Sequence, residues 1–589
     1  MTLRPPAPGR SSGPMPSVIL ALALALGSAC VGGVSPGTGT GGSGPGTGGA
    51  TGTGSTSGTG GAGAQGGAPM NDSPILPARV RRLTNAEYDA SAQALLGTTM
   101  VPSVKFSFPP DARQGPSNQP AGSAFTMNDA QRVDPVLADK LDAAALALVA
   151  EARGNGKLAA LAPCANSATG GEACAKTFLQ TFGARVYRRP LAAEELSELS
   201  VGAASVYHVG ADGGTYEEGI DLLTRVLLQS AGFLYLTELG EAGAGSTFNL
   251  TANETASALS YLLTSAPADP TLLGNAASGL LATPEGREAE ARRLLNLPAG
   301  RARLVRVVQE WLGITDVARR EKAQTVYPEF AGVAASMEAE SRDFINEVLH
   351  NSTGTLAELL TADWTVADAP LSSVYGVSSA GAGKRTSLAG VGRRGILSQG
   401  AFLSVFANNN SSHPVFRGVA ILRRIACQEV PDPGAVGIVV SFPAADPSKT
   451  TRARFESHAM NAGCATCHNT IDPIGFAFEN FDGMGKTRTT ENNMPVDTKV
   501  TIATGSDLDG TYADSVALGN ALAQSPSVKA CLARQLFHSA AARSDASVHG
   551  AEQAFVDVWK QLPVDKQGHL VDVLVAFIRS PLFIQRRTP

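Results

Sequence analysis

Apolar residues recur every three or four positions along most of the chain after residue 80, the spacing of amphipathic helices. Thr84 stands where a helix N-cap is expected and Glu87 follows three residues later, which predicts a capping box. Strict alternation, typical of strands, is rare, and the two candidates are 437–442 and 500–503. The pattern predicts a mainly α, multi-lobed helical protein with few short strands. Further helices are predicted at 134–152, 175–187, 216–230, 253–264, 284–295, 302–312, 334–350, 514–542, 547–562 and 570–579.

The first 30 residues have the layout of an export signal. Arg4 and Arg10 precede an apolar run at 18–26 that is too short for a permanent membrane span. Small residues then lead to Cys30, an arrangement that resembles a bacterial lipoprotein signal in which Cys30 becomes the lipidated first residue. Ordinary signal cleavage, with Cys30 free or removed, is the alternative. Both interpretations predict export to the cell envelope. With a lipid and no acidic residue directly after Cys30, we expect an outer-membrane lipoprotein that faces the periplasm or the cell surface.

The segment that follows, 30–72, is dominated by Gly, Ser, Thr and Ala. Such a composition cannot bury apolar surface, so it predicts a disordered linker between the anchor and the folded body. The net charge of the chain is only −5, with no long basic run, which argues against nucleic acid as a partner. A lipid anchor would be the only membrane attachment, since no later stretch is long and apolar enough to cross a bilayer.

Candidate chemistry concentrates in one pentapeptide, Cys464-Ala-Thr-Cys467-His468. This CxxCH spacing is the attachment pattern of a c-type haem. Two thiols on one helical turn can form thioethers to the two vinyl groups, and His468 then supplies the proximal nitrogen to iron. The sequence therefore predicts haem c, an iron cofactor, on this segment. A disulfide or a zinc site is the alternative. The zinc ligands would be Cys464, Cys467 and either His458 or His468.

The second axial ligand of such an iron is open at the sequence level. His458 lies six residues before Cys464, and Met484 lies in a Gly-Met-Gly turn. Met460 and Met494 are weaker candidates, and an open or water-bound position would permit peroxide or oxygen chemistry. A His/His pair favours a lower potential than His/Met.

The four remaining cysteines are even in number in an oxidising compartment. Cys164 and Cys174 flank a Gly-rich loop and are expected to pair, which leaves Cys427 to pair with Cys531 over a long range. Free buried thiols are the alternative, because connectivity does not follow from sequence.

Four other groups of residues are candidates for haem contacts, catalysis or metal binding. Arginines suit haem propionates, and the phenylalanines after the motif offer either an apolar wall for haem or ordinary core. A nucleophile at Ser411-Ser412-His413 lacks an acid partner, and an Asn-rich turn before Pro explains it. Acidic residues in the 334–350 helix fall on different faces. The residues concerned are Arg417, Arg454 and Arg488; Phe476, Phe478 and Phe481; and Glu338, Glu340 and Asp343.

Several ordered motifs resemble a family of large secreted proteins built from domains of unknown function 1587, 1595, 1592, 1588 and 1585, which are associated with planctomycete-type cytochrome c modules. The resemblance rests on segments 82–88, 182–191, 227–235 with 254–265, 394–397 with 412–418, and 531–537, in that order of domains. The segment 471–482 after the CxxCH motif is similar to the family's D-P-x-G-F-x-x-E-x-F-D pattern. Membership implies a bacterial envelope setting and a c-type haem at 464–468. It supplies no catalytic activity or substrate that could be transferred to this chain.

These observations give an expected organisation and function. The expected segments are signal 1–29, linker 30–72, and helical domains at 73–155, 160–243, 244–376, 385–490 (with the haem motif) and 505–586. We expect a monohaem c-type cytochrome-like protein that passes single electrons to a redox partner protein in the envelope. A haem-dependent oxidative enzyme and a non-catalytic surface scaffold with a structural Cys/His site are the alternatives.

Overall fold

The computed structural model describes residues 72–111, 125–126, 132–166, 171–212, 215–241, 243, 245–431, 443–444, 446–460, 462–543 and 545–588. The predicted signal, Cys30, nearly all of the linker and the predicted strand 437–442 lie outside these residues. The described chain is mainly helical, as the pattern predicted, and its strands form only two-stranded ladders. None of the described helices is long and apolar enough to cross a membrane.

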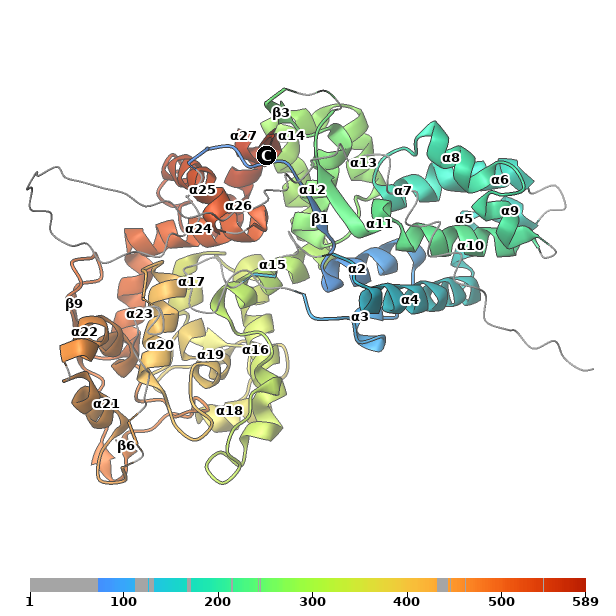
Figure 1. Cartoon of the computed structure of the whole chain (residues 1–589). Helices are drawn as coiled ribbons and strands as arrows, with labels where there is room; N and C mark the ends of the chain where they lie inside the picture. Colours follow the sequence, from blue (N-terminus) through green and yellow to red (C-terminus); the bar gives the residue numbers. More distant parts are fainter. Residues whose placement is uncertain are drawn as a thin grey trace, which may run out of the picture.

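The first lobe lies at one end of the molecule, on the right in Figure 1. Its core brings Leu95, Leu148 and Leu227 together from three helices. The predicted capping box of Thr84 and Glu87 is present at the start of α2. The predicted helix 175–187 is interrupted by a π-helical turn and ends at Arg188, which is left-handed (φ 59°). The elements of this lobe are α2 (Asn85–Leu96), α3 (Pro102–Lys105), α4 (Pro135–Gly154), α5 (Lys157–Leu161), η3 (Pro163–Asn166), α6 (Gly171–Phe178), η4 (Leu179–Gly183), α7 (Ala184–Tyr187), α8 (Ala193–Ser200), α9 (Val206–Ala211), α10 (Tyr216–Gln229) and α11 (Ala231–Leu234).

The second, larger lobe holds the rest of the described helices around one continuous core. That core contains residues from Ala256 to Phe583, so the predicted segments 244–376, 385–490 and 505–586 share it, and Leu76 and Phe125 join it from earlier in the chain. Its helices are α12 (Ala252–Thr264), α13 (Pro270–Ala277), η5 (Leu280–Ala282), α14 (Pro284–Asn296), α15 (Pro298–Leu312), η6 (Val317–Arg319), α16 (Phe330–Asn351), α17 (Leu356–Thr361), α18 (Ala369–Tyr375), η7 (Ile396–Ser398), α19 (Gly400–Val405), α20 (Pro414–Ala420), η8 (Ile421–Ile425), α21 (Thr451–Ala459), α22 (Ala462–Phe476), α23 (Ser515–Gln524), α24 (Pro526–Ala541), α25 (Asp545–Lys560), α26 (Leu570–Arg579) and α27 (Pro581–Ile584).

One predicted helix of this lobe is wrong in its extent. The segment 514–542 forms two helices, α23 and α24, instead of one. Ser525 caps α24 through its side chain and Pro526 occupies the first turn. Proline has no backbone N–H and disfavours helix in the residue before it, so the chain turns at Ser525.

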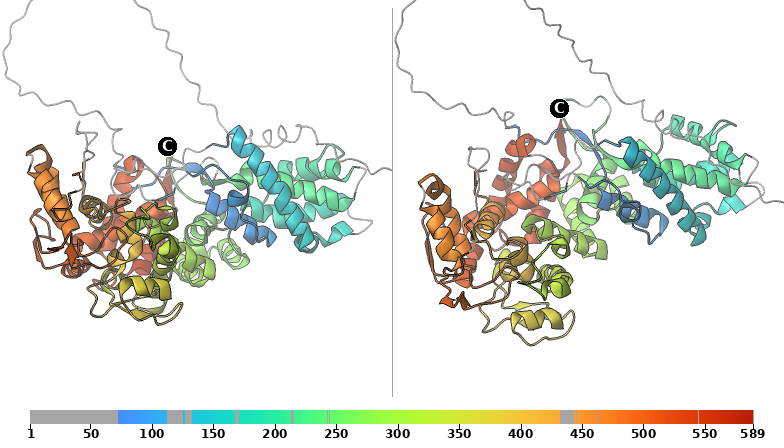
Figure 2. Two further views of the ribbon diagram at one scale, coloured as in Figure 1. Left: turned by 90° about the horizontal axis from the view of Figure 1, so that it is seen from below. Right: turned by 60° about the horizontal axis from the view of Figure 1, so that its bottom comes forward.

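Short strands join the two lobes and both ends of the folded body. Strand β1 (Arg79–Arg82) pairs antiparallel with β2 (Tyr235–Glu238), and β3 (Thr247–Asn249) pairs with β10 (Gln585–Arg587). The backbones of Ala78 and Arg587 are also hydrogen-bonded, so the start and the end of the body lie side by side (Figures 1 and 2). The other strands are local ladders: β4 (Trp364–Thr365) with β5 (Thr386–Ser387), β6 (Thr490–Glu491) with β7 (Met494–Pro495), and β8 (Val500–Ile502), predicted at 500–503, with β9 (Gly510–Tyr512).

Both expected disulfides are present. Cys164 bonds to Cys174 within the first lobe, and Cys427 bonds to Cys531 across 104 residues. Cys427 follows η8 and Cys531 lies in α24, so their disulfide closes a long loop that contains the CxxCH motif.

Candidate functional site

The CxxCH motif lies on α22, which forms a helical hairpin with α21 at one edge of the large lobe (Figure 2). Glu491 anchors the hairpin by accepting hydrogen bonds from the backbone N (2.6 Å) and the hydroxyl (2.7 Å) of Thr451, the first residue of α21. Proline disfavours helix in the residue before it, so Asp472-Pro473 by itself predicts the end of the motif helix. That prediction is wrong, because α22 continues to Phe476 with Pro473 inside it.

Packing against α20 explains why the helix continues past Pro473. A Cβ at Gly475 would lie 1.9 Å from the Pro414 carbonyl oxygen, and a Cβ at Gly418 would lie 2.2 Å from the Ile471 carbonyl oxygen. The two helices therefore approach with their backbones almost in contact, and only glycine allows this. Tertiary contact of this kind overrides the local preference of an Asp-Pro pair.

Cys464 and Cys467 are free and half-buried, and they are separated by one helical turn. The thiols do not form the disulfide that was one alternative. Cys467 packs against the large core. Residues at i and i+3 of a helix lie on one face, so both thiols are on the same side of α22, as two thioethers to one haem require.

His468 is oriented by Asp472, one turn further along α22. Its Nδ1 is 2.9 Å from the Asp472 Oδ1, and the two side chains are 19% and 4% exposed. The hydrogen bond to Asp472, opposed by partial burial, raises the pKa of His468. Since the carboxylate holds the Nδ1 proton, Nε2 is left as the atom able to bind a metal. Two thiols on one helix face followed by such a histidine fit the donor set of haem c.

A zinc site finds less support among the described side chains. No group of three or more His, Cys, Asp or Glu there is placed to hold a metal ion. His458 lies on α21 but its side chain is outside the described part, so its role as a ligand stays a prediction.

The methionines considered as axial ligands lie in different surroundings. Met460 is 86% exposed beside the motif helix, whereas Met484 is 1% exposed. On either side of Met484, Gly483 lies close to Tyr327 and Ser411, and Gly485 lies close to Gly400. Met494 lies in β7 at the turn of a small ladder. Met484 thus belongs to a buried turn of the core, and its use as a ligand stays a prediction.

His413 is a residue near the motif that sequence reasoning did not assign to it. It is fully buried, and its ring stacks on Phe416 (centroids 3.6 Å apart) and meets Phe455 edge-on at 5.1 Å. Burial, with further contributions from Arg417 and the nearby Arg454 and His468, lowers the pKa of His413 to about 3. Its Nδ1 accepts a hydrogen bond from the backbone N of Phe416, so it caps α20. This cap was not predicted from the sequence, although a polar residue directly before a proline is a local signal for a helix start.

Arg417 was predicted to lie near haem propionates, but its guanidinium is engaged within the protein. It is fully buried, and its guanidinium donates to the carbonyl oxygens of Phe478 (2.9 Å), Phe481 (2.9 Å) and Asp482 (2.6 Å). The charge instead stabilises the backbone of the loop that follows the motif. Phe476, the last residue of α22, and Phe478 and Phe481 in the loop are core residues, each 4% exposed or less.

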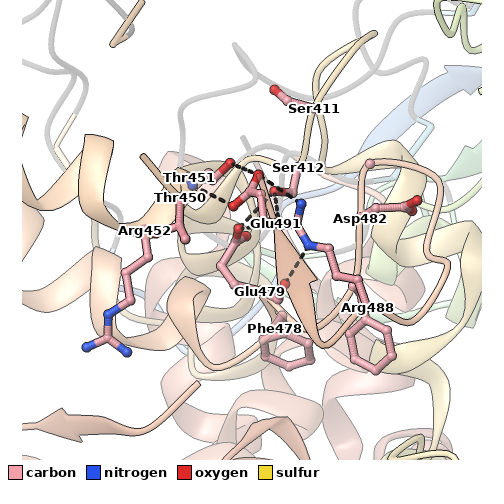
Figure 3. A network of polar contacts seen from close by, with 12 residues as sticks. Ser411, Ser412, Thr450, Thr451, Arg452, Phe478, Glu479, Asp482, Arg488 and Glu491 are labelled. Carbon is pink, nitrogen blue, oxygen red and sulfur yellow. Dashed lines mark hydrogen bonds and ion pairs between the residues drawn. The ribbon is translucent and has the colours of Figure 1, made fainter. Parts of the chain in front are cut away.

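A second buried network links this loop to Ser412 (Figure 3). Glu479 is 1% exposed and accepts hydrogen bonds at 2.9 Å from Arg488 and from Ser412. Burial raises the pKa of Glu479, although Arg488 and Arg417 oppose the shift. Arg488 also binds Glu491, so it too is engaged within the protein, and the hydroxyl of Ser412 is committed to a carboxylate instead of a histidine. Arg454, which donates to Thr451, keeps its predicted role near the propionates as a prediction.

The three acidic residues of α16 that were candidates for metal binding lie in separate surroundings. Glu340 is buried against Thr365 (2.7 Å) and Tyr375 (2.7 Å), whereas Asp343 pairs with Arg342 at the surface. Glu338 lies elsewhere on the helix and accepts from the backbone of Ala318.

Four family models match the chain, in the order the motifs suggested. They are PSD3, a protein of unknown function (DUF1587), at 81–154; PSD5 (DUF1595) at 174–238; PSD4 (DUF1592) at 250–377; and PSCyt3 (DUF1588) at 393–491, which contains the CxxCH motif. No curated protein and no solved structure matches the chain. The 1585-like assignment of 505–586 and the domain boundaries stay predictions. One of these names, PSCyt3, is a planctomycete cytochrome c-associated name. With these four matches, the chain belongs to the multi-domain family that combines domains 1587, 1595, 1592 and 1588.

Proposed function

We propose that this protein is a monohaem c-type cytochrome that transfers single electrons in the cell envelope. The observation that carries the proposal is the geometry of α22: free thiols at Cys464 and Cys467, and His468 with its Nδ1 held by Asp472. The PSCyt3 match over the same segment supports a cytochrome-related role.

In this proposal the chain contributes attachment, orientation and burial. Cys464 and Cys467 would hold the porphyrin through thioethers, and His468 would bind the iron through Nε2. Asp472 keeps the imidazole in one tautomer and increases its basicity. The haem supplies the one-electron chemistry when bound. Cys467 faces the apolar core, which lowers the local dielectric constant on that side.

The proposed setting follows from the first residues of the chain. Export, lipidation at Cys30 and the Gly-, Ser- and Thr-rich linker 30–72 would place the folded body at the outer membrane, facing the periplasm or the cell surface. The proposed partner is another redox protein of the envelope, and the balanced charge of the chain gives no reason to expect nucleic acid.

The direct test of this proposal is whether haem is covalently attached to the exported protein. We expect the exported full chain, produced with a cytochrome c maturation system, to give a pyridine haemochrome spectrum after denaturation and a mass increased by one haem. The Cys464→Ser/Cys467→Ser variant should lose both signals. The matched control is Cys164→Ser/Cys174→Ser, which removes two other cysteines and should keep both. A colourless wild-type product without added mass contradicts the proposal.

The spectrum of the native protein separates electron transfer from the oxidative alternative. A low-spin, six-coordinate haem is expected for transfer, whereas a high-spin haem that binds cyanide or peroxide indicates an enzyme. Zinc in place of iron would instead indicate the structural Cys/His site of a scaffold protein.

A further inference from the structure

A cavity of about 790 Å³ lies between the two lobes. Helix α2 and the β1–β2 ladder line one side, and α12, α15 and α24 line the other. None of the described residues between 320 and 538 lines it, so it is separate from the CxxCH motif. Its size and its place between lobes are those of small-molecule sites.

One face of α15 turns toward this cavity. Ala299, Ala302, Arg303, Arg306 and Glu310 line it, at the three- and four-residue spacings of a single helix face. The two alanines leave room beside the arginines. Arg306 is engaged by Glu310 at 3.1 Å.

Two hydrogen-bond donors on the wall are unused among the described residues. The Nε of Arg303 is buried without an acceptor, and the guanidinium lies 3.9 Å from the Glu310 carboxylate. Burial opposes the shift, but nearby positive charges, among them that of Arg303, lower the pKa of Glu87 across the cavity. Ser539 is 6% exposed and its buried hydroxyl also has no partner. Both residues line a second, small void beside the cavity, together with Leu262 and Leu536, so they lie on the same part of the wall. An unpaired buried donor is destabilising, and most buried polar groups in folded proteins have a hydrogen-bond partner. A bound ligand would supply that partner here.

The carboxylates of the wall give no comparable site for a cation. They outnumber the guanidinium groups, but they already accept hydrogen bonds from protein groups. The pairs are Glu87 with Arg81, Asp89 with Ser103, Asp111 with Asn85, Glu238 with Arg79 and Arg586, Glu254 with Thr251, Glu310 with Arg306, and Asp316 with Thr315. The unused groups of the described wall are the donors Arg303 Nε and the Ser539 hydroxyl and one neutral acceptor, Asn85 Oδ1. Only Arg303 carries a charge among them, and a guanidinium suits an oxyanion.

We propose that this cavity binds a small organic carboxylate, whose oxygens accept hydrogen bonds from Arg303 and Ser539. The apolar body of the ligand would lie against Leu236, Leu262 and Ala302, which line the same cavity. Arg303 pairs well with a planar carboxylate because the guanidinium offers parallel N–H groups. The site is independent of haem and would load in both haem-containing and haem-free protein.

Calorimetric titration of the full chain with benzoate, benzamide and benzylamine at constant ionic strength tests this proposal. We expect benzoate to bind and its neutral amide and cationic analogues to bind at least about tenfold more weakly, because a charge-assisted hydrogen bond contributes more than a neutral one. Arg303→Gln should weaken benzoate binding about tenfold or more, and Ser539→Ala should weaken it severalfold. The matched control is Arg342→Gln, a surface arginine of the same lobe, which should leave the affinity unchanged.

Each of the contrary outcomes overturns the proposal. They are no benzoate binding at millimolar concentration, tighter binding of benzylamine, or equal loss in the Arg303 and Arg342 variants. If Arg303→Gln does not fold, Ser539→Ala decides the question, since it removes one oxygen atom only. Unchanged benzoate affinity in a folded Ser539→Ala protein would show that the hydroxyl has no ligand role. Because haem-free protein serves as well, failure here is distinct from failure of haem attachment.

Discussion

Single residues of this chain take their roles from burial rather than from type, as two carboxylates of α16 show. Glu338 and Glu340 are two positions apart, yet only Glu340 is enclosed, at 1% exposure. Its neighbours Thr365 and Tyr375 donate hydrogen bonds to it, but burial dominates and raises the pKa of Glu340 to about 7. Burial of a charged carboxylate is costly, so the group stays protonated well above its ordinary range.

This shift predicts a loss of stability at alkaline pH. The folded protein holds the Glu340 proton more tightly than the unfolded chain, so the contribution is complete below the unfolded pKa of 4.5 and is lost as the pH rises through about 7. We expect Glu340 to lower the free energy of unfolding by about 3 kcal/mol between pH 5 and pH 9. Chemical denaturation across this range measures it. Glu340→Gln should flatten the profile and Glu338→Gln should not; a flat wild-type profile contradicts the assignment.

At the residue scale, the motif could be predicted from the sequence but its surroundings could not. Cys464, Cys467 and His468 were identifiable from spacing alone. His413 and the buried role of Arg417 were not, because the environments of both depend on segments more than 40 residues away in the chain. A single sequence does not show which carbonyl oxygens will surround a guanidinium.

At the scale of elements, helix contacts rather than local preferences shape the motif region. Helix α22 runs through Pro473 because α20 lies directly against it, with Gly475 and Gly418 at the points of closest approach. Helix α24, by contrast, begins where the local signal of Ser525-Pro526 places it. Pro526 thus marks the start of a helix, whereas Pro473 stays inside α22, where α20 packs closely against the helix.

Gly475→Ala should therefore destabilise the protein. The added methyl would lie 1.9 Å from the Pro414 carbonyl oxygen, which is backbone and cannot move away cheaply. We expect a cost of about 1–3 kcal/mol or more, as in other overpacked cores, measured by thermal or chemical unfolding. The matched control is Gly274→Ala in α13, where no atom lies within 4 Å of the new Cβ, and which should be neutral or stabilising by about 0.5–1 kcal/mol. Equal effects of both variants would show that α20 and α22 are not in close contact.

At the scale of the whole molecule, a buried ion cluster at the strand junction holds the lobes together. Glu238 of β2 binds Arg79 (2.9 Å), Arg543 (2.9 Å) and Arg586 (2.5 Å). These arginines come from the start of the body, from the end of α24 and from β10. Burial opposes ionisation, but Arg586, Arg79 and Arg543 outweigh it and hold the pKa of Glu238 well below its usual range.

Glu238→Gln should weaken this junction strongly. The variant keeps the shape of the side chain but leaves buried guanidinium groups uncompensated, for which we expect a loss of about 3–5 kcal/mol. Chemical denaturation should show a lower midpoint and separate unfolding of the two lobes. Asp343→Asn, at the exposed pair with Arg342, is the control and should cost about 1 kcal/mol or less. An unchanged midpoint in Glu238→Gln would contradict a role for the cluster in joining the lobes.

What the sequence determined by itself was local: the helical pattern, the Thr84 cap and the CxxCH spacing. Such features depend on residues a few positions apart. The pairing of Cys427 with Cys531 was expected only because few partners remained, and the structure decided it. Only the tertiary structure decided which groups are buried together. It set Asp472 and His468 in one bonded pair, enclosed His413, Arg417 and Glu340, and left two unused donors in a cavity between the lobes. The reason is physical: pairing, burial and pKa depend on distances between distant segments, and these are fixed only when the core closes.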